Sequence, residues 1–83
     1  MFPENNLSID STTAFATINV TETVFSFYQY YLGKNLSSEN LYHFQNALEY
    51  QKQAIVSLKQ SEDPLGYLSY MNLALTEYSE ISY

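Results

Sequence analysis

Turn-forming residues are scarce in this chain. Glycine and proline occur only twice each in 83 residues, which leaves few tight turns and argues against a fold of many strands. Apolar residues make up 46% of the chain, which is enough to build a hydrophobic core. The sequence therefore favours one small domain made of a few long helices.

Three segments space their apolar residues as helices do. We expect helices near 12–33, 38–61 and 64–80, with a polar lead-in at 1–11 and a single helical domain at 12–83. Gly33 can end the first helix, Ser37 or Ser38 can cap the second, and Asp63 with Pro64 can begin the third. Because the connections are short, neighbouring helices should run antiparallel in an all-α, three-helix up-down bundle.

The first segment leaves an alternative open. Residues 12–24 are rich in β-branched side chains, and apolar residues alternate with polar ones at 15–21. A short strand at 15–21 followed by helices is therefore the alternative to a first helix. No later segment has the pattern of a pairing strand, which favours the helix.

The apolar spacing also predicts which side of each helix is buried. The expected core side chains are Ile18, Phe25, Leu32, Leu41, Phe44, Leu48, Ile55, Leu58, Leu68 and Leu75. The third helix carries a second apolar strip that includes Tyr67, Tyr70 and Ile81. A helix that is apolar around so much of its circumference lies between two neighbours or meets another chain. The first helix shows the same excess at Phe27 and Tyr30, so we expect self-association, as a homodimer.

The composition narrows the class of partner. The chain contains nine tyrosines and five phenylalanines. It has three lysines and nine acidic residues, which give a net charge of -6. Tyrosine suits surfaces that become half-buried on binding. An acidic surface favours a partner protein with a basic patch, and so few cations argue against direct nucleic-acid binding.

The expected protein-binding site lies on the third helix. Its anchors would be Tyr67, Tyr70 and Ile81, with Glu77 and Glu80 as an acidic rim, and the alternative is Phe27 with Tyr30 on the first helix. A tyrosine anchor buries a large rigid area at a small cost in side-chain entropy.

Residues typical of catalytic sites are sparse. The chain has no cysteine, which excludes a thiolate metal site and a cysteine nucleophile. His43 is the only histidine, it lacks companions at the spacing of metal ligands or a catalytic triad, and we expect it to be solvated. Gly33 and Gly66 are too few for a phosphate-binding loop. We therefore expect a protein that is not an enzyme and that holds no cofactor or metal.

One stretch resembles a known repeat. Residues 47–50 (ALEY) and 54–55 (AI) resemble the second helix of a tetratricopeptide repeat, and 72–74 (NLA) resembles the start of the next repeat. The resemblance covers less than half of the chain, and the linker with Pro64 comes about five residues late for that repeat. It implies a packed helical hairpin used in protein binding, without membership of the family.

These observations lead to a hypothesis of function and two alternatives. The leading one is a non-catalytic, acidic helical module that serves as adaptor, regulator or inhibitor of a partner protein, such as a viral or plasmid accessory inhibitor. The alternatives are a structural homo-oligomer subunit and a small-molecule binder with a Tyr-lined cavity. No secretory signal and no membrane span are expected, which fits a cytoplasmic protein of viral or bacterial origin.

Overall fold

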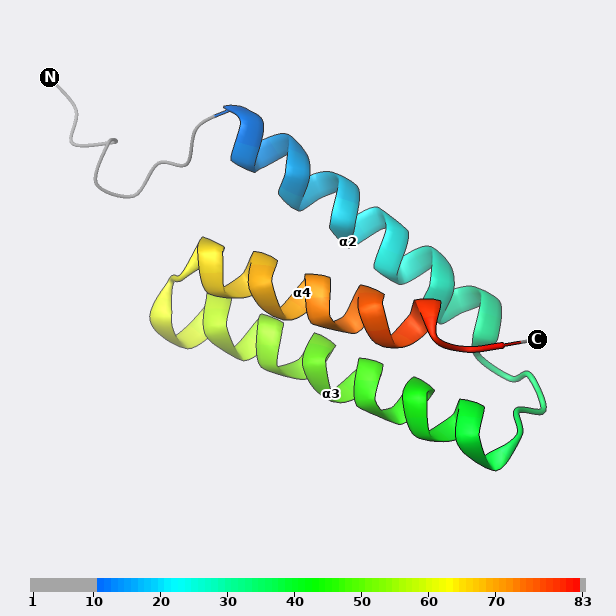
Figure 1. Cartoon of the computed structure of the whole chain (residues 1–83). Coiled ribbons are helices and arrows are strands. Elements are labelled where there is room, and N and C mark those ends of the chain that lie inside the picture. Colours follow the sequence, from blue (N-terminus) through cyan, green and yellow to red (C-terminus); the bar gives the residue numbers. More distant parts are fainter. Residues whose placement is uncertain (1–10, 83) are drawn as a thin grey trace, which may run out of the picture.

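The computed structural model describes residues 11–82, which form three helices joined by short connections. They are α2 (Ser11–Tyr31), α3 (Ser38–Ser61) and α4 (Pro64–Ser79). Figure 1 shows the three helices running in alternating directions, with α4 between α2 and α3. The described part of the chain contains no strand, so the predicted all-α three-helix up-down bundle is confirmed and the alternative strand at 15–21 is wrong.

The predicted polar lead-in at 1–11 lies outside the described residues, apart from Ser11. Among the helices of residues 11–82, none combines the length and the apolar character that crossing a membrane requires.

α2 is helical despite its many β-branched residues. The Oγ1 atoms of Thr17 and Thr23 each lie 2.8 Å from a backbone carbonyl oxygen one turn earlier, that of Thr13 and that of Asn19. Such hydrogen bonds satisfy a threonine hydroxyl inside a helix. Burial of Val24 on the inner face of α2 adds packing energy that favours the helix. The strand propensities of different residue types span only about 1 kcal/mol and depend on context. Tertiary packing therefore decides the conformation of this segment.

The connection between α2 and α3 uses the residues that the sequence indicated. Gly33 adopts a positive φ of 83°, and the Lys34 amide donates to the Tyr31 carbonyl oxygen at 3.0 Å. Ser37 caps α3, because its Oγ accepts a hydrogen bond from the Asn40 amide at 3.3 Å. These two local signals place the end of α2 and the start of α3.

The connection between α3 and α4 is tighter. Glu62 ends α3 in the left-handed conformation (φ 48°, ψ 48°). Asp63 caps α4, which begins at Pro64, because its carboxylate accepts a hydrogen bond from the Gly66 amide at 3.0 Å. A Cβ atom added to Gly66 would lie 2.6 Å from the Oγ of Ser57. A side chain at Gly66 would therefore collide with Asp63 and Ser57, so glycine lets the start of α4 lie close to the end of α3.

α4 is the central helix of the bundle. It packs closely on α3 and also contacts α2, whereas α2 and α3 meet only slightly. The buried apolar side chains are Val20, Val24, Tyr31, Phe44, Ala47, Ala54, Met71, Ala74, Tyr78 and Ile81. Three of them are alanines of α3 and α4, and such small side chains let two helix axes approach. The position between two neighbours explains why α4 is apolar around so much of its circumference.

The predicted core is wrong at six positions. Ile18 and Leu32 are 52% and 55% exposed, and Phe25, Leu41, Ile55 and Leu58 are exposed as well. Phe44 is buried as predicted, and Leu48, Leu68 and Leu75 are partly buried against the core. The buried side of α3 includes Ala47, Gln51 and Ala54, whose small or polar side chains give only a weak hydrophobic signal. The larger leucine stripe beside them dominated the sequence pattern.

Candidate binding surfaces

The apolar strip predicted on α4 is turned largely toward the neighbouring helices. Ile81 belongs to the buried core, and Tyr67 and Tyr70 are partly buried against it. The hydroxyl of Tyr67 lies 2.8 Å from the Oγ1 of Thr21 in α2, so this strip helps to hold α2 on α4. Its role in binding a partner stays a prediction, and in this arrangement the side chain of Ile81 is not accessible.

The two predicted rim carboxylates meet His43 of α3. His43 Nδ1 lies 2.8 Å from Glu77 Oε1, and His43 Nε2 lies 3.6 Å from Glu80 Oε1. The Asn46 side chain also donates to Glu77, at 3.5 Å. The expectation that His43 is solvated is wrong, because this cluster joins the C-terminal end of α4 to α3. The hydrogen bond that protonated His43 donates to the Glu77 carboxylate raises the pKa of His43 above 6.5, and the nearby charge of Glu80 adds to the rise.

A metal site does not arise from this cluster. Within residues 11–82, no group of three His, Cys, Asp or Glu side chains is placed to hold a metal ion. The His43 cluster is thus a candidate for pH-dependent stability.

Protonated His43 should stabilise the fold. Its pKa is near 6.5 in the unfolded chain and higher in the folded one, so the stabilisation is complete below about 6.5 and is lost as pH rises through the folded value. We expect the free energy of unfolding, from urea denaturation, to fall as pH rises from about 6 to 8. His43→Gln should flatten this slope, and an unchanged slope in that variant would assign it to other groups.

An aromatic cluster fills the end of the bundle near the α2–α3 connection. The fully buried Tyr78 ring lies 5.8 Å from Phe27, 6.4 Å from Tyr31 and 6.0 Å from Phe44, between ring centroids. The Tyr78 hydroxyl donates a hydrogen bond to the buried Oε1 of Gln51. Burial raises the pKa of Tyr78 well above its usual range, so the hydroxyl stays protonated and keeps donating. Rings of α2, α3 and α4 are therefore held together around one side chain.

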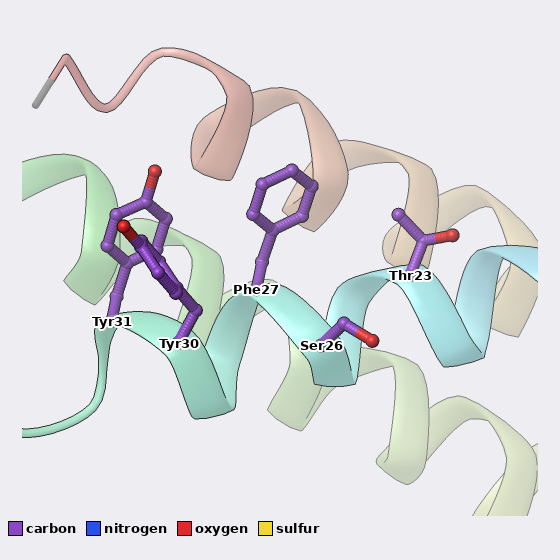
Figure 2. Close-up of a pocket in the computed structure, with 5 residues that line it drawn as sticks. All are labelled: Thr23, Ser26, Phe27, Tyr30 and Tyr31. Atoms are coloured by element: carbon purple, nitrogen blue, oxygen red, sulfur yellow. The ribbon is translucent and has the colours of Figure 1, made fainter.

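The outer side of this cluster forms a hollow on α2, shown in Figure 2. This open hollow has a volume of about 590 Å³ and is lined by Thr23, Ser26, Phe27, Tyr30 and Tyr31, and we call it the aromatic hollow. Figure 2 shows the rings of Phe27 and Tyr31 pointing from α2 toward α4. Tyr30 is 58% exposed, and its ring stands edge-on to Tyr31 with centroids 5.0 Å apart. The Nζ of Lys34 lies 4.6 Å from the centre of the Tyr30 ring.

The alternative site predicted from the sequence falls in this hollow. Phe27 and Tyr30 both line it, and the structure adds Thr23, Ser26 and Tyr31, which the sequence analysis missed. Counted from Thr23, the other four lining residues follow at three, four, seven and eight residues, which places them along one side of a helix. That signal was present in the sequence, but it was weaker than the tyrosine strip of α4.

A second depression lies where α2 diverges from α3. This open depression has a volume of about 410 Å³ and is lined by Thr17, Ile18, Thr21 and Glu22 of α2, Leu58 of α3, and Pro64 and Tyr67 of α4; we call it the α2–α3 groove. It lies on a different flank of α2 from the aromatic hollow, because the two share no lining residue.

Comparison with protein-family models, curated proteins and solved structures finds no match to this chain. The tetratricopeptide resemblance of residues 47–74 therefore remains a local likeness. What the protein does has to be inferred from its own surfaces.

Proposed function

We propose that this protein is a non-catalytic helical module that binds another protein through the aromatic hollow of α2. The observation that supports this most directly is the exposure of Tyr30 beside the rings of Phe27 and Tyr31. A tyrosine ring that is more than half exposed next to buried rings can extend an existing aromatic cluster into a partner.

The hollow is held in shape before any partner arrives. The Phe27 and Tyr31 rings are stacked with centroids 6.1 Å apart, and both stack on Tyr78. A contact surface whose side chains are already ordered loses little conformational entropy on binding. The hydroxyls of Thr23, Ser26 and Tyr30 offer hydrogen bonds at its edge, as is typical of tyrosine- and serine-rich contact surfaces.

The charge of the chain supports a basic partner. The net charge is -6, and exposed carboxylates occur on all three helices or beside them, at Glu22, Glu39, Glu49, Glu62, Asp63 and Glu80. A negative field of this kind attracts a positively charged surface and speeds encounter. An adaptor, regulator or inhibitor of a basic protein is the role that such binding would serve.

Truncating Tyr30 tests the proposal. Tyr30→Ala should weaken binding by about 30-fold, or about 2 kcal/mol, because it removes the exposed ring of the hollow. The partner protein is first isolated from the source cells by its affinity for the immobilised wild-type protein. Its dissociation constant is then measured by calorimetric titration with the wild type and with the variant.

Tyr42→Ala is the matched control for this measurement. Tyr42 is also an exposed helical tyrosine, but it lies on α3, away from the hollow. It should leave the affinity unchanged. If the Tyr30 variant binds as tightly as the wild type while it remains folded, the hollow is not the contact surface.

A further inference from the structure

Two apolar stripes with seven-residue spacing remain on the surface of the bundle. On α2 the stripe consists of Ile18 and Phe25 and continues to Leu32, the residue after its end, and in α3 it consists of Leu41, Leu48 and Ile55. Leu48 is partly buried and the other five side chains are exposed. Side chains seven residues apart lie on nearly the same side of a helix, and sustained stripes of this kind are the contact faces of helical bundles.

The two stripes lie at matching levels on one side of the molecule. Ile18 lines the α2–α3 groove together with Leu58, one turn beyond Ile55. At the other end of the two helices, the Tyr28 and Phe44 rings stack with centroids 6.3 Å apart. Because α2 and α3 are antiparallel, these two contacts bring Phe25 level with Leu48, and they place Ile18 and Leu32 within about one turn of Ile55 and Leu41.

We propose that a second copy of this chain covers these stripes, with α2 of each copy lying on α3 of the other. A two-fold axis parallel to the helices would produce this pairing and would close the assembly as a dimer. The four helices would then form an antiparallel bundle, and both pairs of stripes would point toward its centre. This interface uses a different flank of α2 from the aromatic hollow, so it goes beyond the proposed function and is independent of it.

Charge complementarity argues for a second copy as the occupant. Glu22 is the only charged residue of α2, and it is exposed beside the Ile18–Phe25 stripe. The same register brings it level with the exposed Lys52 of α3, beside the Leu48–Ile55 stripe. Within residues 11–82 neither side chain makes an ion pair. Stacking α2 on α3 of the second copy would pair Glu22 with Lys52 twice, and would likewise place Gln29 against Gln45.

Charge reversal combined with light scattering tests the proposal. The wild type should show twice the chain mass of 9.6 kDa at high micromolar concentration. Glu22→Lys and Lys52→Glu should each raise the dimer dissociation constant by about tenfold, because each creates two like-charge contacts. The double reversal should restore the wild-type constant, since it re-forms both pairs with opposite polarity.

A second pair of variants tests the apolar stripe. Phe25→Glu should give a monomer, whereas Tyr30→Glu should stay dimeric, because Tyr30 is an exposed aromatic residue of the same helix that lies on the other flank, in the aromatic hollow. Circular dichroism confirms that each variant is folded. A wild type that remains at 9.6 kDa would overturn the proposal. The stripes would then be a contact surface for a helix of a different protein. A dimer that the double reversal fails to restore would overturn this interface.

Discussion

Replacing Tyr78 by alanine should remove most of the stability of this protein. The side chain is fully buried and contacts rings from both neighbouring helices, so its loss leaves a cavity where all three helices meet. Truncation of a large aromatic core residue costs about 3–5 kcal/mol. A chain of 83 residues has a total stability of about 4–12 kcal/mol, so this cost is a large share of it.

Thermal unfolding followed by circular dichroism measures this effect. For a domain of this size the expected fall in Tm is about 15 °C or more. Tyr78→Phe keeps the ring contacts but leaves the buried Gln51 without its donor, so it should cost an intermediate amount, about 1–3 kcal/mol. A Tm for Tyr78→Ala close to that of the wild type would show that the aromatic cluster does not hold the bundle together.

Replacing Val24 by aspartate should be comparably destructive. Val24 is fully buried on the face of α2 that packs in the bundle, and no cation lies on its own helix to pair with a new carboxylate. An uncompensated buried charge costs about 3–5 kcal/mol, and protonation of the aspartate would relieve only part of it. Urea denaturation at pH 7 should therefore show a large fall in the midpoint concentration.

The neighbouring residue supplies the control. Phe25 is exposed, so Phe25→Asp at low protein concentration should change the free energy of unfolding far less than Val24→Asp. The two variants share a helix and introduce the same charge, and they differ in the side of the helix that they occupy and in the side chain that they remove. If Phe25→Asp proved the more damaging, the buried side of α2 would be the one that the sequence pattern indicated.

Local features of the sequence were sufficient to place the helices. The predicted ends at 33, 38, 61 and 64 agree closely with Tyr31, Ser38, Ser61 and Pro64, because glycine, serine and proline act on the backbone next to them. The helical state of 15–21 was harder to predict. Its β-branched residues favour a strand locally, and only packing of Val20 and Val24 in the bundle resolves the conflict.

The candidate surfaces depended on the rotation of each helix about its axis. The sequence identified Phe27 and Tyr30 only as an alternative to the α4 strip, because it could not show that α4 would lie between two neighbours. His43 and Glu77 are 34 residues apart, so no local pattern could predict their hydrogen bond.

The sequence by itself determined that most of the chain is helical, where the helices begin and end, and that it carries more apolar surface than one small bundle can bury. Those properties depend on residues close together in the chain. Only the tertiary structure decided which flank of each helix is buried. Large side chains such as Ile18 and Leu41 remain exposed, while alanines at positions 47, 54 and 74 are buried, because small residues let α3 and α4 approach closely and that contact sets the rotation of both helices.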